Sequence, residues 1–155
     1  MPRSCAEVRE QTPDGDAHST VELLGDRWTL LVIRDIMICN RRRYCDLLSM
    51  SEEGITRNLL TSRLVSLLEK GMLTETPARR LQGLFSLTEK SIQLVPVLAR
   101  ICIWAGENLG AREINSRAGA IVYGGPKRWL AFMDELRQLH LDSNPAHGNA
   151  ARNST

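Results

Sequence analysis

The fold of this chain is decided by the stretch GITRNLLTSRLVSLLEKG, residues 54–71. Its leucines recur every three or four positions, which places them on one stripe of a helix and predicts that the stripe packs into a core. We expect Thr56 to cap the amino end of this helix and Gly71 to end it in the left-handed conformation. The sequence therefore predicts an amphipathic helix over residues 56–70, whose inward side chains are Leu59, Leu60, Leu64, Leu67 and Leu68.

The other face of this helix is polar and uncrowded. Its first two turns carry Arg57, Asn58, Thr61 and Ser62, side chains that can donate to phosphates and read the edges of bases. Arg63 borders the leucine stripe and could equally lie over the core with its charge in water. Capped amphipathic helices are common, so the neighbouring segments must decide what this one does.

A second, more apolar segment precedes it at residues 27–37. Asp26 is placed to cap its start, and a helix buried in the middle of a small domain fits its composition. A buried strand is the competing interpretation, because Val32 and Ile33 are β-branched. The length of the segment and its internal polar pair favour the helix.

Concentrated positive charge follows in Arg41, Arg42 and Arg43. A short helix over residues 44–50 and a tight turn at residues 51–54 then lead into the helix described first. Two helices joined by a glycine-bearing turn, the second with a polar outer face, form the helix-turn-helix pattern, whose second helix enters the major groove. The arginine run could be an ordinary solvated surface, but its place where the DNA backbone would pass favours phosphate contacts.

Strand-like alternation appears on both sides of a basic turn after Gly71, at residues 72–76 and 83–87. Two such strands predict a β-hairpin, which we interpret as a wing over residues 73–87 with Arg79 and Arg80 at its turn. An ordinary surface hairpin is the alternative. The position directly after a recognition-type helix favours the wing.

A long apolar helix is predicted over residues 89–109, with Thr88 as its cap and Pro96 as a kink or break. So much apolar surface outside a compact winged domain needs a partner, and a symmetric homodimer supplies one. The alternative is that this stripe folds back on its own domain. The residues predicted at the dimer interface are Leu98, Ile101, Trp104 and Ala105.

The predicted fold class is mainly α with a small β-hairpin: a winged helix-turn-helix with additional carboxyl-terminal dimerisation helices. Residues 1–16 are expected to be a flexible arm and 142–155 a disordered tail. The DNA-binding domain with its dimer helix spans 17–110, beginning with a short helix over residues 17–24. In the extension at 111–141, residues 111–125 look irregular and residues 127–141 form an amphipathic helix that covers the domain or completes the dimer. A pocket between protomers, near Trp104, Trp129 and Phe132, is a hypothesis.

The composition limits the function classes. A net charge of +2 over 155 residues means that any nucleic-acid site must come from local clustering of charge. Without an apolar run long enough to span a bilayer or a secretion signal, a cytoplasmic protein without membrane partners is expected. No metal-ligand spacing, phosphate loop or nucleophile motif occurs, so we expect no cofactor, no metal and no enzyme. Thiol sensing by Cys39 or Cys45 would lie close to the DNA-reading unit, although buried inert cysteines are more common.

With these residues placed, residues 20–110 resemble the HxlR-type winged helix-turn-helix transcriptional regulators of bacteria. The motifs fall in the order and spacing of that family, with RYCDL standing for its Arg-Phe-x-Glu-Leu. The resemblance implies a dimeric DNA-binding regulator that acts on promoters near its own gene. The motifs are LLGDRWTLL (23–31), IRDI (33–36), RYCDL (43–47), GIT (54–56), LTSRL (60–64), LLEKG (67–71), FSLTEK (85–90), PVL (96–98) and WA (104–105).

Three features depart from the family pattern. Gly15 and Asp16 stand where many members carry a Cys-Pro pair that some use as a redox or electrophile sensor, so that sensor is missing. Ser91 replaces the glycine usual after the Thr-Glu-Lys of the wing. The extension past Gly110 is longer than the minimal family unit, and effector or dimer chemistry can differ there.

Together these observations predict a sequence-specific regulator of transcription, with repression the expected mode. Its partners would be double-stranded DNA, a second copy of itself and an unidentified small-molecule effector. The predicted DNA contacts are Arg57, Asn58, Thr61 and Ser62 for bases, Arg41, Arg42, Arg43, Arg63, Arg79 and Arg80 for phosphates, and Thr56 at the start of the helix. The alternatives are a winged-helix protein-interaction module, which an acidic or apolar outer helix face would indicate, and a small enzyme, which would need convergent titratable residues.

Overall fold

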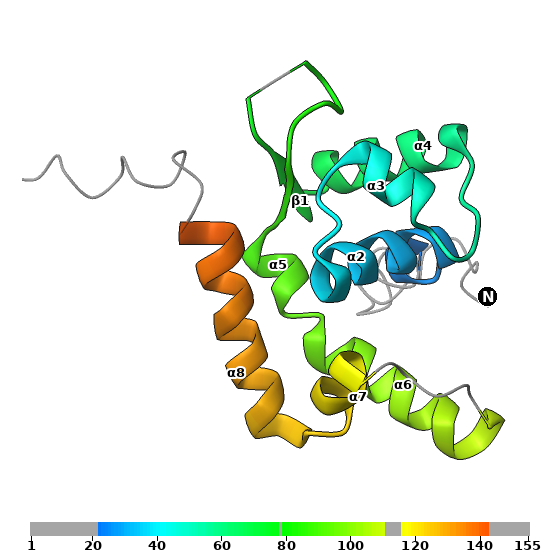
Figure 1. The fold of residues 1–155 in the computed structure, drawn as a ribbon, viewed down its shortest axis with the longest axis vertical. Helices are drawn as coiled ribbons and strands as arrows, with labels where there is room; N and C mark the ends of the chain where they lie inside the picture. The colour runs from blue at the N-terminus through cyan, green and yellow to red at the C-terminus, as the bar shows by residue number, and fades with distance from the viewer. Residues whose placement is uncertain (1–21, 78, 111–115, 143–155) are drawn as a thin grey trace, which may run out of the picture.

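The computed structural model describes residues 22–77, 79–110 and 116–142, and it is mainly helical with one small hairpin (Figure 1). The expected arm at 1–16 and all but Asp142 of the expected tail lie outside the described residues, as do residues 17–21 of the first predicted helix. The elements are α2 (Arg27–Cys39), α3 (Tyr44–Ser49), α4 (Arg57–Glu69), β1 (Leu73–Glu75), β2 (Phe85–Leu87), α5 (Glu89–Ile92), α6 (Val95–Leu109), α7 (Ser116–Val122), α8 (Gly125–Arg137) and the π-helical η1 (Gln138–Asp142).

Both predicted caps of the central helices are present. The Asp26 carboxylate accepts from the Thr29 amide at 2.8 Å and begins α2, which excludes the strand interpretation of this segment. The Thr56 hydroxyl accepts from the Leu59 amide at 3.4 Å and begins α4. Gly71 has φ +65°, the left-handed conformation that a glycine adopts without steric cost.

The core lies where α2, α4 and the hairpin meet. The leucine stripe of α4 faces this core as predicted, with three of its leucines fully buried and Leu59 and Leu68 half-buried against it. Burial of this stripe, rather than helix propensity, supplies most of the stability of α4. The side chains without exposed surface include Ile33 and Ile36 of α2, Leu60, Leu64 and Leu67 of α4, and Phe85 and Leu87 of β2.

The predicted hairpin forms with shorter strands than the sequence indicated. Its strands are antiparallel and three residues long each, with Leu73 opposite Leu87 and Glu75 opposite Phe85. All three residues of β2 are buried. β2 is therefore an internal strand, covered by helices although it has only one strand as a neighbour.

Pro96 divides the predicted helix over 89–109 into α5 and α6. It lies in the first turn of α6, where its missing N–H is not needed for a helical hydrogen bond. Thr88 precedes α5 but does not cap it through its side chain. Its hydroxyl instead donates to the Gly71 and Met72 carbonyls, at 2.8 and 3.2 Å, and so ties the end of the hairpin to the end of α4.

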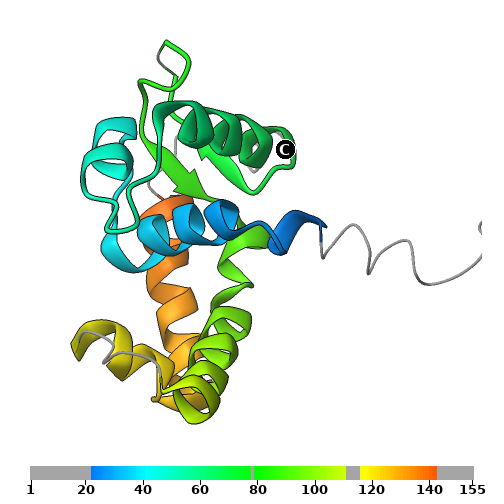
Figure 2. The same cartoon turned by 90° about the vertical axis from the view of Figure 1, so that its right-hand side faces the viewer.

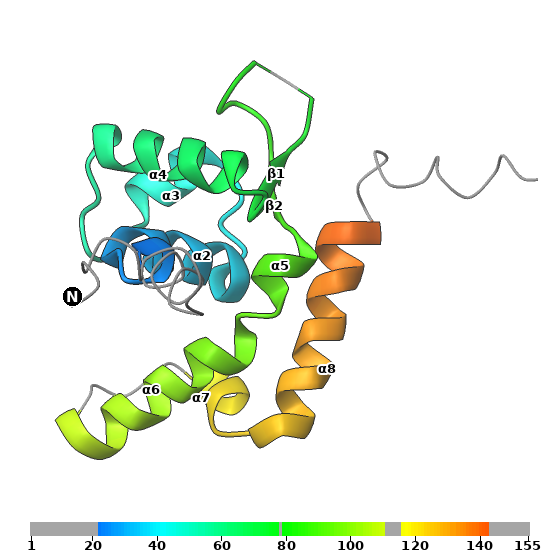
Figure 3. The same ribbon diagram turned by 180° about the vertical axis from the view of Figure 1, so that it is seen from behind.

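The carboxyl-terminal part corrects one prediction. Residues 116–122 form the helix α7, although the sequence there looked irregular, because contacts with α6 and α8 stabilise a segment too short to show a period. α8 begins at Gly125 and buries Trp129, Phe132, Met133 and Leu136. It therefore covers its own domain, running from α7 up to the base of the hairpin (Figures 1 and 3).

At the end of α8, His140 contacts the hairpin. Its imidazole is almost fully buried, and its Nδ1 accepts a hydrogen bond from the Leu87 amide at 3.2 Å. Burial, with a smaller contribution from the charge of Arg42, lowers the pKa of His140 to about 4. The folded protein therefore contains a neutral imidazole.

This burial makes stability depend on pH. Between pH 6.5 and about 4 the unfolded chain binds a proton at His140 that the folded chain does not bind, so the free energy of unfolding should fall as the pH drops through this window. The loss should be on the order of 3 kcal/mol. Urea unfolding at several pH values from 7 to 4.5 measures it.

His140→Asn is the control, because asparagine presents an acceptor close to the position of Nδ1 but does not titrate. The pKa values of the paired carboxylates Asp26, Glu53 and Glu89 are lowered, so those groups lose their pairs mainly at more acidic pH. The same slope in both proteins between pH 6.5 and 4.5 would contradict the assignment to His140.

Candidate nucleic-acid interface

α3, the turn after it and α4 form the predicted helix-turn-helix. Tyr44 of α3 fixes the two helices to each other, since its hydroxyl donates to the Arg57 carbonyl at 3.2 Å and lies 3.0 Å from the Thr61 hydroxyl. Gly54 turns the chain with φ +70° in a position open to solvent. The start of α4 is therefore held at a defined angle to α3.

Most of the polar face of α4 is exposed to solvent. Thr56, Arg57, Asn58 and Ser62 are exposed, whereas Thr61 is half-buried beside Tyr44. Within the described ranges no carboxylate pairs with the Arg57 guanidinium. Figures 1 and 2 place α4 and the hairpin tip at one end of the molecule, and α7 with the start of α8 at the other.

The three consecutive arginines separate into different roles. Arg43 is exposed, but Arg41 pairs with the buried Asp35 at 3.0 Å. Arg42 donates through Nε to the Phe85 carbonyl at 2.9 Å and through Nη2 to the Ser86 hydroxyl, and burial lowers its pKa. From the sequence we predicted that all three arginines form one charged patch. This prediction missed the partners of Arg42 because they lie more than forty residues away in the chain.

Arg63 lies toward the core, where it pairs with Asp26, rather than on the outer face of α4. Its Nη2 donates to Asp26 Oδ1 at 3.0 Å, and its Nε lies 2.7 Å from Oδ2 without hydrogen-bond geometry. Burial alone would raise the pKa of Asp26, but hydrogen bonds from Thr29 and the pairing with Arg63 lower it. One carboxylate thus caps α2 and anchors α4.

A second ion-pair network, which the sequence did not reveal, supports the turn. Arg34 donates to Glu53 at 2.8 Å and to Asp35 at 2.7 Å, and Asp35 in turn binds Arg41. Asp35 is 3% exposed, so its charge requires these partners. The network ties α2 to the residue before Gly54.

The wing carries Arg79 and Arg80 at its tip. Both side chains are exposed, and neither has a carboxylate partner in the part of the chain that the structure describes. Leu81 beside them is half-buried against the core and has φ +62°, an uncommon conformation for leucine. The hairpin therefore presents two exposed arginines at the same end of the molecule as α4 (Figure 1).

The predicted dimer residues lie on α6 at the other end. Ile101 and Trp104 are 49% and 56% exposed, whereas Leu98 and Ala105 are half-buried. Val97, which the sequence analysis did not include, is 43% exposed and extends the same stripe one turn earlier. α6 thus turns one side to its own domain and leaves an apolar stripe uncovered in this single chain.

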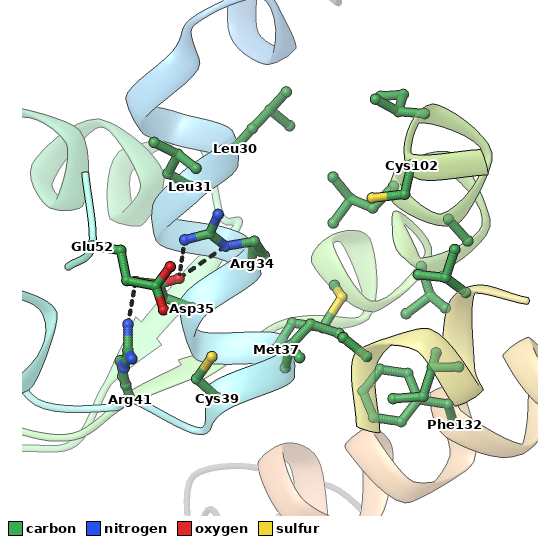
Figure 4. A pocket seen from close by; sticks show the side chains of 18 residues that line it. Leu30, Leu31, Arg34, Asp35, Met37, Cys39, Arg41, Glu52, Cys102 and Phe132 are labelled. Atoms are coloured by element: carbon green, nitrogen blue, oxygen red, sulfur yellow. Dashed lines mark hydrogen bonds and ion pairs between the residues drawn. The ribbon is translucent and has the colours of Figure 1, made fainter. Parts of the chain in front are cut away.

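A cavity of about 420 Å³ lies between α2 and the helices α6 to α8. Figure 4 shows Leu30, Arg34 and Asp35 on the side of α2, with Cys102 and Phe132 facing them. The predicted pocket was placed between protomers near two tryptophans, whereas this cavity lies within one chain and only Phe132 of that group lines it. Trp129 is buried instead, and its indole donates to the Val122 carbonyl at 3.2 Å.

The cysteines differ in exposure. Cys39 and Cys45 are exposed, so the expectation of buried thiols is wrong for both. Cys102 is half-buried at the cavity, and burial raises the pKa of its thiol. Among the described residues we find no group of side chains arranged to hold a metal ion, and no helix long and apolar enough to cross a membrane.

The fold and the exposed face of α4 define a winged helix-turn-helix protein. The chain belongs to the HxlR-like helix-turn-helix family, whose model matches residues 23–113. This membership makes it a DNA-binding transcriptional regulator.

Two solved structures are similar to this chain, and both support the fold. One is PA1607, a candidate transcription factor (24% identity, TM-score 0.55, covering 71% of this chain and 74% of that one). The other is the reduced form of the transcriptional regulator YodB from B. subtilis (23% identity, TM-score 0.51, covering 66% and 99%). A comparison with curated proteins gave no match.

The double role of Asp26 can be separated by substitution. Asp26→Ala removes both the cap and the partner of Arg63 and should cost about 2–3 kcal/mol of unfolding free energy. Asp26→Asn keeps a good cap and should lose less. Urea denaturation measures both; Asp134→Ala, which removes a 67% exposed carboxylate, should stay within about 0.5 kcal/mol of the parent. Equal losses for Ala and Asn would contradict the capping role.

Proposed function

We propose that this chain acts in the cytoplasm as a homodimeric repressor that recognises a specific double-stranded DNA site. α4 enters the major groove and the wing lies on the backbone or in the minor groove. The observation that carries the proposal is the exposed polar face of α4 at the same end of the molecule as the two exposed arginines of the wing. Such a face combines donors for base edges with charges for phosphates.

The proposed DNA contacts follow from which side chains are exposed and which are held by other residues. Arg57, Asn58, Thr61 and Ser62 face base edges, with Thr56 at the helix start beside them. The exposed Arg43, Arg79 and Arg80 bind phosphates. Arg41, Arg42 and Arg63 are held by Asp35, β2 and Asp26, and they support the interface rather than bind DNA directly.

DNA binding is tested by selecting duplexes from a random-sequence library and measuring affinity with excess competitor DNA. Arg57→Ala should weaken binding to the selected site by about 1–3 kcal/mol and relax the preference at one base position. The double variant Arg79→Ala/Arg80→Ala should reduce the magnitude of the negative slope of log affinity against log salt by about two, since two phosphate contacts are lost.

Arg117→Ala is the matched control for these variants. Arg117 is an exposed arginine of α7 at the opposite end of the molecule, so its loss should leave both affinity and salt slope unchanged. Selection of no enriched site, with binding abolished by competitor, would contradict sequence-specific recognition and support a protein-interaction module instead.

The homodimer is supported by the uncovered stripe of α6. Val97, Ile101 and Trp104 follow one another at helical spacing and are each more than two-fifths exposed. A second copy that packs against this stripe would remove it from water and leave α4 accessible at the other end of each protomer. Half-buried Leu98 and Ala105 would border the interface.

Trp104→Glu should convert the dimer to a monomer, because a charge would be buried in the apolar interface. Sedimentation velocity measures this change. Met50→Glu is the control, since Met50 is also an exposed apolar residue (54%) but follows α3. A parent chain that sediments as a monomer, or a Trp104→Glu dimer as stable as the parent, would contradict this interface.

The small-molecule effector expected from the sequence is assigned to the cavity between α2 and α6. Its size falls in the range of ligand sites, and mainly apolar side chains line it. The charged groups at its edge already pair with one another, as Arg34 does with Asp35. The cavity therefore fits an uncharged, largely apolar molecule.

A further inference from the structure

The second edge of β2 is held by side chains and backbone from outside the hairpin. In an antiparallel strand, alternate residues direct their amides to opposite edges. Phe85 and Leu87 direct theirs away from β1: the Phe85 amide donates to the Arg42 carbonyl at 2.8 Å, and the Leu87 amide to His140 Nδ1 at 3.2 Å. The buried strand β2 thus has partners on both edges.

Of these two contacts at the outer edge of β2, the one with His140 comes from the carboxyl-terminal extension. The ring is 1% exposed, and its Nε2 has no hydrogen-bond partner among the described residues. Because Nδ1 accepts, the proton of the neutral ring lies on Nε2. The imidazole therefore makes one directional bond, and that bond is to the wing strand.

A second contact holds the same end of α8 in place. Arg137 binds Glu89 of α5 in two places, with Nε 2.9 Å from Oε2 and Nη2 2.7 Å from Oε1. This pair precedes His140 by less than one helical turn. It therefore fixes η1 against the segment that leaves β2.

The family model ends at residue 113, whereas α8 and η1 span residues 125–142. The contact between His140 and Leu87 is accordingly a feature of this chain beyond the part that defines its family. A hairpin of two three-residue strands is marginally stable alone and depends on packing and on what holds its edges.

We propose that His140 is a positioning residue for DNA binding: through its bond to the Leu87 amide, the carboxyl-terminal extension holds the wing where Arg79 and Arg80 reach the DNA backbone. The proposal rests on the proposed function for its consequence on DNA, but its structural step is independent of DNA. The extension is therefore part of the DNA-binding machinery although it lies outside the helix-turn-helix.

The structural step is tested by hydrogen exchange of the Leu87 amide, followed by NMR in the full chain without DNA. His140→Leu removes the acceptor at similar volume, so the Leu87 amide should exchange about ten- to hundredfold faster. His140→Asn restores an acceptor near Nδ1 and should recover most of the protection. Leu139→Ala, at the exposed neighbouring position, should leave the Leu87 amide unchanged.

The functional step is tested by a double-mutant cycle on DNA affinity. Removing Arg79 and Arg80 together should weaken binding by a smaller factor in the His140→Leu background than in the parent, because the wing is then no longer held against DNA. His140→Asn should restore the full factor. A His140 that merely stabilised the fold would leave this factor the same in both backgrounds.

The two steps fail in distinguishable ways. Unchanged exchange of the Leu87 amide in folded His140→Leu overturns the proposal whether or not the protein binds DNA. Faster exchange with an unchanged factor for the two arginines overturns the role in DNA binding. Absence of specific DNA binding in the parent chain overturns the proposed function and with it the role in DNA recognition, while the exchange experiment still decides whether His140 holds the wing.

Discussion

A charged side chain that leaves water must find a partner, and this constraint organises the end of the protein that carries α4 and the hairpin. The pairing of Asp26 with Arg63 satisfies it between α2 and α4, and the pairing of Asp35 with Arg41 satisfies it beneath the turn. Among the described residues at this end, Arg43, Arg57, Arg79 and Arg80 are exposed and have no carboxylate partner. Internal pairing thus decides which of the positive charges at this end remain exposed to solvent.

The two ends of the molecule have different surfaces, and α8 runs from one toward the other (Figure 1). The end with α4 and the wing exposes Arg57, Arg79 and Arg80, whereas α6 at the other end exposes an apolar stripe. α8 runs between these ends: Phe132 lines the cavity near α6, and η1 brings His140 to β2. A change in the packing of α8 would therefore alter contacts both at the cavity and at β2.

Local chemistry made much of the fold predictable. Caps at Asp26 and Thr56, the left-handed Gly71 and the break at Pro96 depend on residues close in sequence, and the structure contains all four. α7 was missed because its seven residues, most of them small or β-branched, show no clear period, and its helix depends on α6 and α8. The cavity within the chain was not predicted because its walls come from four helices.

By itself the sequence determined the order of the elements from α2 to α6, the two faces of α4 and the pattern of the winged helix-turn-helix, since these follow from periodicity and from residues a few positions apart. Only the tertiary structure decided which arginines are free, because the partners of Arg42 and Arg63 lie about forty residues away in the chain. The bond between His140 and Leu87 spans more than fifty residues and depends on how α8 packs. Contacts between residues so far apart in the chain depend on how whole helices and strands pack, and a local sequence pattern does not predict that packing.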